Sequence, residues 1–298
     1  MNNLTISNLS KTYSNGTRAL NSVSLDIPPG MFGLLGPNGA GKSTLMRTIA
    51  TLQEADSGSV QFGELDVLKD ITEVRRILGY LPQEFGLYPR ISAEDLLNHL
   101  AILKGIKKAS ERKELVEGLL HKTNLYIHRK KNLGGYSGGM KQRFGIAQAL
   151  LSNPELIIVD EPTAGLDPTE RNRFHNILCE LGENTVVILS THIVEDVKEL
   201  CTNMAIINNG EVLLQENPLT AINQIKGNVY SKTIHKEGLE EYKQSYNVIA
   251  ERLFQGKKVI HIYHEQDPGR GFTSVEASLN DVYFSQIFGN TVQTSQAQ

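Results

Sequence analysis

The sequence has few cysteines, no long apolar run and no clear excess of either charge. The two cysteines, Cys179 and Cys201, fit neither a disulfide framework nor a zinc-binding pattern, so we expect both to be buried, small apolar residues. No apolar segment approaches the ~18 residues that a membrane-spanning helix needs. The 30 Lys and Arg nearly balance the 33 Asp and Glu, which argues against a protein that neutralises many nucleic-acid phosphates.

The start of the chain also lacks the features of an export signal. Residues 1–5 have neither a basic start nor an apolar core, so we expect a cytoplasmic protein. With 298 residues, of which 40% are hydrophobic, the chain is long enough to bury a large core. The same composition excludes wholesale disorder.

Short apolar runs predict a buried parallel sheet. Residues 31–35, 156–159 and 186–189 are continuously apolar rather than alternating, which is typical of strands covered by helices on both faces. Between these runs, apolar residues recur at helical spacing after two candidate N-cap residues, Ser92 and Ser137. The pattern predicts an α/β fold.

Other segments predict antiparallel strands beside that sheet. Residues 1–27 and 59–62 contain short strand-like runs between turns, and residues 204–207 and 212–214 flank an Asn-Asn-Gly turn that is typical of a hairpin. The predicted fold class is therefore α/β with a mainly parallel core sheet and an antiparallel β patch.

The character of the sequence changes after about residue 216. The remaining segment, 217–298, has strand-like residues at 259–263 but no phosphate-binding motif, so we expect a small α+β accessory region there. Its last residues, 293–298, are expected to form a disordered tail.

The strongest signal is a glycine-rich segment that matches the phosphate-binding loop pattern. In this pattern glycines let backbone N–H groups surround the phosphates, Lys42 reaches the β- and γ-phosphate oxygens, and Ser43 holds Mg²⁺. The segment follows an apolar run and leads into a helix-like stretch, and a helix N-terminus favours anions, so a turn without a ligand is the weaker reading. The candidate nucleotide-binding residues here are Asn38, Gly39, Ala40, Gly41, Lys42, Ser43 and Thr44.

Two adjacent carboxylates end the apolar run at 156–159. Asp160 is placed to hold the Mg²⁺ of a bound nucleotide, which leaves Glu161 to act on an attacking water. Taken alone, an Asp-Glu pair usually marks only the end of a strand. Together with a phosphate-binding loop, the pair predicts nucleotide hydrolysis.

A third motif is Ser137-Gly138-Gly139, at the start of a predicted helix. Ser137 is a suitable N-cap, and the two glycines let backbone amides approach an anion closely. Taken alone, the segment is equally consistent with an ordinary capped helix.

The order and spacing of six motifs resemble the nucleotide-binding subunits of ABC transporters over residues 1–216. The resemblance implies a P-loop NTPase cassette with a helical subdomain at about 84–150. The motifs are the phosphate-binding loop, Gln83 after Leu78-Gly79-Tyr80-Leu81-Pro82, Ser137-Gly138-Gly139, Asp160-Glu161, Ala164-Gly165-Leu166-Asp167 and His192.

The resemblance also implies roles for individual residues. Tyr13 would stack on adenine, although a strand aromatic in the core is the alternative. Gln83 would contact Mg²⁺ or the attacking water, unless it is only a surface amide. Glu161 would be the general base, and His192 would contact the γ-phosphate unless it is only a hydrogen-bonded polar residue. The metal set would be Ser43, Gln83 and Asp160.

In this family, ATP is sandwiched between the phosphate-binding loop of one cassette and the Ser-Gly-Gly signature of another. The resemblance therefore implies a dimer, homodimer or heterodimer, with Asp167 at the interface and Ser137, Gly138 and Gly139 contacting the partner's ATP. Tyr136 and Met140 replace the commonest Leu and Gln beside the signature, and Met140 cannot supply an amide hydrogen bond.

The region around Leu87 and Tyr88 corresponds to the part of the family cassette that docks a separately encoded transmembrane permease. Residues 277–283 resemble a stretch of exporter-type ATPases of the drug, bacitracin and sodium-efflux kind, with Asn280 in place of Glu. These resemblances imply the ATPase motor of a membrane exporter, peripheral on the cytoplasmic face of the membrane through its permease. The alternatives are a soluble ABC ATPase acting on ribosomes or DNA, and a metabolite kinase.

A metal site in the accessory region is the remaining possibility. His261, His264 and Glu265 carry ligand atoms, but alternation along a predicted strand favours an incidental arrangement.

Overall fold

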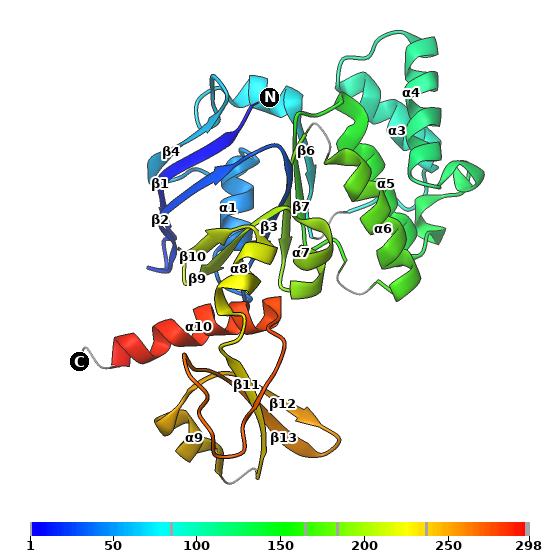
Figure 1. Cartoon of the computed structure of the whole chain (residues 1–298). Coiled ribbons are helices and arrows are strands. Elements are labelled where there is room, and N and C mark those ends of the chain that lie inside the picture. The colour runs from blue at the N-terminus through cyan, green and yellow to red at the C-terminus, as the bar shows by residue number, and fades with distance from the viewer. Residues whose placement is uncertain (1, 84–85, 164–165, 183–184, 236–237, 296–298) are drawn as a thin grey trace.

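The computed structural model describes residues 2–83, 86–163, 166–182, 185–235 and 238–295, and side chains up to Phe288. Figure 1 shows a larger upper part that contains two sheets and most of the helices, and a smaller part below it formed by the C-terminal residues. None of the helices in these ranges is long and apolar enough to cross a membrane.

The core sheet has six strands in the order β10-β9-β3-β8-β7-β6. Strand β3 pairs in parallel with β8 and β9, and β7 pairs in parallel with β6 and β8. Every residue of β7 and β8 is buried, as the uninterrupted apolar runs predict. The strands are β3 (Gly30–Leu35), β6 (Leu78–Leu81), β7 (Leu156–Asp160), β8 (Val186–Thr191), β9 (Asn203–Asn208) and β10 (Glu211–Glu216).

The antiparallel patch is a second sheet in the order β2-β1-β4-β5. Its strands are β1 (Leu4–Thr12), β2 (Arg18–Ile27), β4 (Ser57–Phe62) and β5 (Leu65–Asp66). Helix α1 (Lys42–Ile49) contributes Leu45, Met46 and Ile49 to a core shared with strands of both sheets. Because both sheets hold α1, the loop before it has a fixed position. Helix α2 (Ile71–Ile77) precedes β6.

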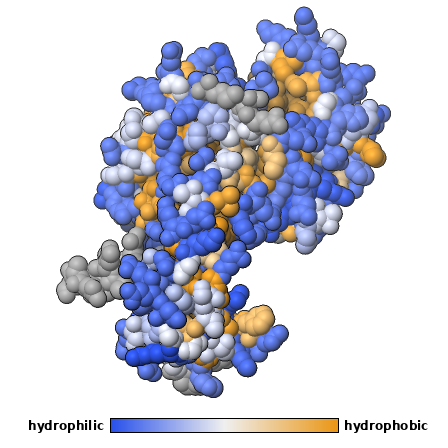
Figure 2. All heavy atoms as spheres, in the orientation of Figure 1, coloured by the Kyte–Doolittle hydropathy of each residue, from blue (hydrophilic) through white to orange (hydrophobic). Residues whose placement is uncertain are grey.

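Helices α3 (Ala93–Leu103), α4 (Ala109–Lys122) and α5 (Gly138–Ala149) form the predicted helical subdomain. The predicted caps are present: Ser92 Oγ accepts a bond from Asp95 N at 3.1 Å, and Ser137 Oγ accepts one from Met140 N at 3.2 Å. Hydrophilic residues cover most of the face in Figure 2, and a hydrophobic patch is visible over α3 and α4. The short 3₁₀ turns are η1 (Tyr126–His128), η2 (Leu133–Gly135) and η3 (Leu150–Ser152).

Helices α6 (Pro168–Leu181) and α7 (Val194–Leu200) cover the core sheet next to the helical subdomain. Cys201 is buried at the end of α7, as expected. The expectation was wrong for Cys179, which lies exposed on α6. The reason is the face of the helix, since the neighbouring Ile177 and Leu178 turn inward and fill the core.

The C-terminal part contains α8 (Pro218–Ile225), α9 (Leu239–Ser245), α10 (Leu279–Ser295) and a sheet in the order β12-β13-β11-β14. Leu279, Val282 and Tyr283 of α10 join the apolar core of the cassette, so this part is attached by packing as well as by the chain. The boundary at 216 stays a prediction. Helix α10 extends to Ser295, and 296–298 lie outside the described residues. The strands are β11 (Val229–Ile234), β12 (Asn247–Phe254), β13 (Lys257–Tyr263) and β14 (Thr273–Ser274).

His261 uses Nδ1 for a 2.7 Å contact with the buried carboxylate of Asp281, and His264 Nδ1 lies 2.7 Å from Gln266 O. Within the described ranges, no three His, Cys, Asp or Glu side chains form a group that could hold a metal ion.

Candidate active site

The phosphate-binding loop connects β3 to α1. Gly41 has φ of +105° at the N-cap of α1, and a Cβ there would collide with Ala19 O. Helix α1 has no capping side chain and no acidic residue in its first turn. Its first N–H groups are therefore free to receive an anion, and the helix dipole favours one.

Lys42 places its ammonium inside this loop. Nζ donates to Gly36 O at 2.7 Å and to Pro37 O at 3.1 Å, and it lies 3.5 Å from Glu161 Oε1. Burial lowers the pKa of Lys42, and the charge of Glu161 opposes that shift. The loop lysine and the proposed catalytic carboxylate therefore belong to one cluster.

Asp160 ends β7 and is only 3% exposed. Burial raises the pKa of its carboxyl, while the nearby hydroxyls of Ser190 and Ser43 lower it. Its Oδ1 is buried and has no hydrogen-bond partner among the described residues. A buried carboxylate oxygen without a donor, next to the Ser43 hydroxyl, fits the oxygen ligands that Mg²⁺ prefers.

Glu161 is the centre of the site. Its Oε2 lies 3.2 Å from Gln83 Nε2 and 3.2 Å from His192 Nδ1. Gln83 and His192, which follow β6 and β8, thus both contact the carboxylate of Glu161, which follows β7. Glu161 also has φ of +46°, which is unusual outside glycine, and its N–H donates to Ser190 O at 2.9 Å. This strained backbone at a strand end is typical of functional sites.

The cluster opens to solvent on one side. His192 has a side chain that is 44% exposed, whereas Glu161 is only 9% exposed. Gln83 is also exposed. A water molecule or a phosphate can therefore approach Glu161 and His192 from that side, while Lys42 and Asp160 remain inside.

Tyr13 lies between β1 and β2, next to the phosphate-binding loop. Its hydroxyl is 3.0 Å from Thr44 Oγ1 and donates to Gln53 Oε1 at 3.1 Å. With 38% of the residue exposed, Tyr13 is not a core aromatic, so that alternative is excluded. Stacking on adenine stays a prediction. Of the remaining loop residues, Asn38, Gly39 and Ser43 are exposed, while Ala40 and Thr44 are buried.

The signature lies away from the phosphate-binding loop, although Gly138 lines a cavity together with Gln83. Ser137 and Gly138 are exposed at the start of α5, and β6 and β7 lie between α5 and α1 in Figure 1. Gly139 packs against Glu170 of α6 so closely that a Cβ would collide with its carboxylate. The structure therefore does not bring the signature to the phosphate-binding loop of its own chain.

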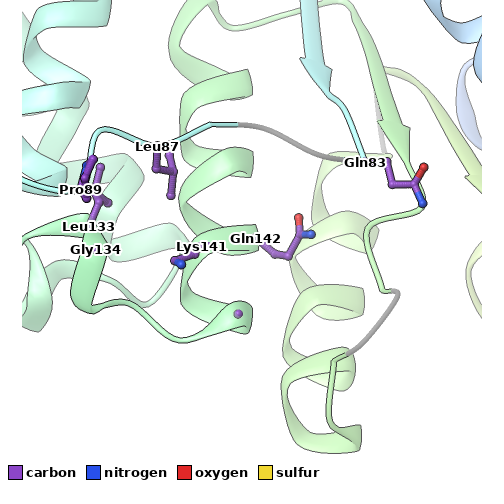
Figure 3. Close-up of a pocket in the computed structure, with 8 residues that line it drawn as sticks. Gln83, Leu87, Pro89, Leu133, Gly134, Lys141 and Gln142 are labelled. Carbon is purple, nitrogen blue, oxygen red and sulfur yellow. The ribbon is translucent and has the colours of Figure 1, made fainter.

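A cavity of about 340 Å³ separates Gln83 from the signature helix. Figure 3 shows Leu87 and Pro89 on one wall and Lys141 and Gln142 projecting from α5 on the other. Leu87, expected in partner docking, therefore lines a groove that reaches the catalytic cluster. Tyr88 is 71% exposed, and Phe85, at the start of the same segment, lies outside the described residues.

Asp167 caps α6, where its Oδ1 accepts a bond from Glu170 N at 2.9 Å. Ala164 and Gly165 of the same motif lie outside the described residues. Residue patterns did not identify Asp196, a fully buried acid on α7 that bonds to the segment after Glu161. No local signal marks it, because its partners come from three other parts of the chain.

Comparisons with known proteins agree with the geometry. A family model described as "ABC transporter" matches residues 20–164. The ABC transporter ATP-binding protein NatA of Bacillus subtilis (strain 168) is 38% identical over 66% of this chain and 80% of its own length. The daunorubicin/doxorubicin resistance ATP-binding protein DrrA of Streptomyces peucetius is 33% identical over 92% of this chain and 80% of its own.

Among solved structures, the dimeric, post-hydrolysis ATP-binding cassette MJ0796 bound to ADP and Pi has a TM-score of 0.66 and 28% identity. The similarity covers 72% of this chain and 98% of that one. The α/β cassette fold and the family expected from the motifs are confirmed. This chain belongs to the family of ABC transporter ATP-binding proteins, and it is an ATPase.

Proposed function

We propose that this chain is the ATP-hydrolysing motor subunit of a membrane exporter and works with a separately encoded transmembrane permease. The observation that carries the proposal is the meeting of Lys42, Gln83 and His192 on Glu161. An ordinary structural ion pair would not require a carboxylate that is strained, buried and shared by the ends of three strands. The exporter assignment is supported by DrrA, a resistance protein whose similarity extends over 92% of this chain.

In the proposed reaction, the phosphates of ATP lie on the N–H groups of residues 38–44, and Lys42 moves from the loop carbonyls to the β- and γ-phosphate oxygens. Glu161 accepts a proton from the water that attacks the γ-phosphorus, the bond from that phosphorus to the β–γ bridging oxygen breaks, and ADP and phosphate are the products. His192 contacts the γ-phosphate and keeps Glu161 in position. Tyr13 stacks on the adenine.

Asp160, Ser43 and the amide oxygen of Gln83 are the residues that would hold Mg²⁺. When bound, the ion would neutralise part of the negative charge of the phosphates. Gln83 already donates to Glu161 through Nε2, so its amide can join the metal side of the site to the hydrolytic side.

The signature requires a second cassette, since Ser137 and Gly138 are exposed and lie away from the phosphate-binding loop of their own chain. We infer that Ser137, Gly138 and Gly139 cover ATP bound by the partner cassette, and that Asp167 lies near that interface. Binding of ATP closes the pair, and loss of the γ-phosphate reopens it.

The permease is proposed to dock at the groove of Gln83, Leu87 and Pro89, so that its movement reaches Glu161 through Gln83. This contact would hold the chain at the cytoplasmic face of the membrane. The test is purification of the tagged chain from detergent-solubilised cells. A polytopic membrane protein should co-purify with the wild type and be lost with Leu87→Asp.

Leu253→Asp is the control for the same substitution outside the groove, because Leu253 is an exposed leucine of the C-terminal sheet. It should retain the membrane protein. Consistent recovery of ribosomes or DNA in place of a membrane protein would contradict the transporter role and favour a soluble ABC ATPase.

A further inference from the structure

A buried acid next to the catalytic cluster has no assigned role. Asp196 lies in the first turn of α7, just after His192, and is fully buried. Its Oδ2 accepts a hydrogen bond from Thr163 Oγ1 at 2.6 Å and a longer one from Thr191 Oγ1 at 3.5 Å. Its Oδ1 accepts a bond from Arg171 Nε at 2.8 Å and lies 3.0 Å from His175 Nε2.

Two of these partners adjoin the catalytic residues. Thr163 follows Glu161 after a single proline, and Thr191 directly precedes His192. Thr191 Oγ1 also accepts a bond from Ile193 N at 2.9 Å, which fixes the turn that carries His192. One carboxylate oxygen therefore contacts both segments whose side chains meet 3.2 Å apart at the site.

The energetics argue that this carboxylate is ionised and fully engaged. Burial alone raises the pKa of Asp196, but hydrogen bonds from His175, Thr163 and Arg171 outweigh burial, so its pKa lies below the usual value. A buried charge of this kind is tolerated only while its partners stay in place. Thr163 is therefore held tightly by Asp196, at 2.6 Å, and Thr191 is linked to it by the longer contact of 3.5 Å.

The other two partners extend the network to the signature helix. Arg171 and His175 lie on α6, and the adjacent Glu170 accepts a contact from the buried Arg143 of α5 at 3.1 Å. Glu170 also fills the space beside Gly139. The first turn of α6 thus lies between the signature helix and Asp196.

We propose that Asp196 is a positioning residue for ATP hydrolysis: it holds the Glu161 and His192 segments in their hydrolytic arrangement and connects that arrangement through α6 to the signature. The proposal rests on the catalytic role of Glu161 proposed above. Asp196 contacts neither nucleotide nor water in this scheme, so its effect is on the rate of hydrolysis and not on binding.

The test is Asp196→Asn, which keeps the shape of the side chain and removes its charge. Single-turnover hydrolysis should fall by about tenfold or more, while the affinity and stoichiometry for fluorescent MANT-ATP stay within about twofold of the wild type. Asp281→Asn is the matched control. Asp281 is also almost fully buried, and its carboxylate lies 2.7 Å from His261 Nδ1 and 2.6 Å from Ser278 Oγ, but it lies in α10.

Both variants should lose thermal stability, and only Asp196→Asn should lose turnover per bound nucleotide. An unchanged turnover in Asp196→Asn overturns the proposal. A fall in the hydrolysis rate that only equals the fall in the number of MANT-ATP binding sites overturns it as well. If Asp196→Asn does not fold, Thr163→Val decides, because it removes one hydroxyl only. It should slow hydrolysis, and a wild-type rate there also overturns the proposal. A wild type that binds MANT-ATP without hydrolysing ATP would contradict the Glu161 mechanism itself.

Discussion

Replacement of Glu161 by Gln is the most direct test of the catalytic cluster. The side chain keeps its shape but can no longer accept a proton, and a positioned general base contributes about 100- to 10,000-fold to a rate, or about 3 to 5 kcal/mol of barrier. The change also removes the anion 3.5 Å from Lys42 Nζ. Opposite charges at about 4 Å attract by about 4 kcal/mol at an effective dielectric constant of ~20, so Glu161 competes with ATP for that ammonium. Glu161→Gln should therefore hydrolyse ATP at least about 100-fold more slowly and bind it more tightly.

The assay combines phosphate release with size-exclusion chromatography in Mg²⁺ and ATP. The variant should accumulate as a closed dimer that dissociates when ATP is removed, because the γ-phosphate is no longer cleaved. Glu195→Gln is the control, since Glu195 is an exposed acid on α7 that pairs with Lys198, at 3.6 Å. Undiminished hydrolysis in Glu161→Gln, or slow hydrolysis without a stable dimer, would refute the reasoning.

Three further substitutions, two of them with a matched control variant, test the surroundings of this cluster. Burial raises the pKa of Asp160 in the folded protein, so its ionised form destabilises the ligand-free protein above the ordinary pKa of an aspartate. Asp160→Asn should therefore raise the melting temperature in EDTA, and the gain should grow as the pH rises from that ordinary pKa to the raised pKa of Asp160. The same variant should lose Mg²⁺-dependent hydrolysis. Arg143→Met leaves the largely buried Glu170 without its buried partner and should lower the free energy of unfolding in urea by about 3 kcal/mol. Arg173→Met, on the exposed side of Glu170, should lower it by about 0.5 kcal/mol. Gly139→Ala should cost about 1 to 3 kcal/mol through overpacking against α6, while Gly138→Ala, with open space around its Cβ, should leave unfolding unchanged; equal melting curves for the two would contradict the packing argument.

The cassette fold was largely predictable because its signals are local. Continuous apolar runs identify β3, β7 and β8, and the serines before α3 and α5 cap helices as expected. The exposure of Cys179 was not predictable in the same way, because the burial of a residue on α6 depends on which face of the helix meets the sheet. The attachment of α10 to the core also escaped prediction, since it depends on contacts between distant parts of the chain.

The candidate site shows the same limit. Motif order predicted the residues that meet at Glu161, but it could not predict that Gln83, Lys42 and His192 would all contact the same carboxylate. Asp196 was missed because a single acid after a histidine is unremarkable in a sequence. Its importance arises only from hydrogen bonds to α6 and to the ends of two strands.

The return of α10 to the cassette has a consequence for how the chain folds during synthesis. Leu279, Val282 and Tyr283 join the same apolar core as Val197 and Leu200 of α7. Since the ribosome makes α10 after all of the cassette strands, the part of α7 that packs against α10 stays uncovered until those residues emerge. A chain that ends before α10 should therefore expose this apolar surface to solvent and be prone to aggregation.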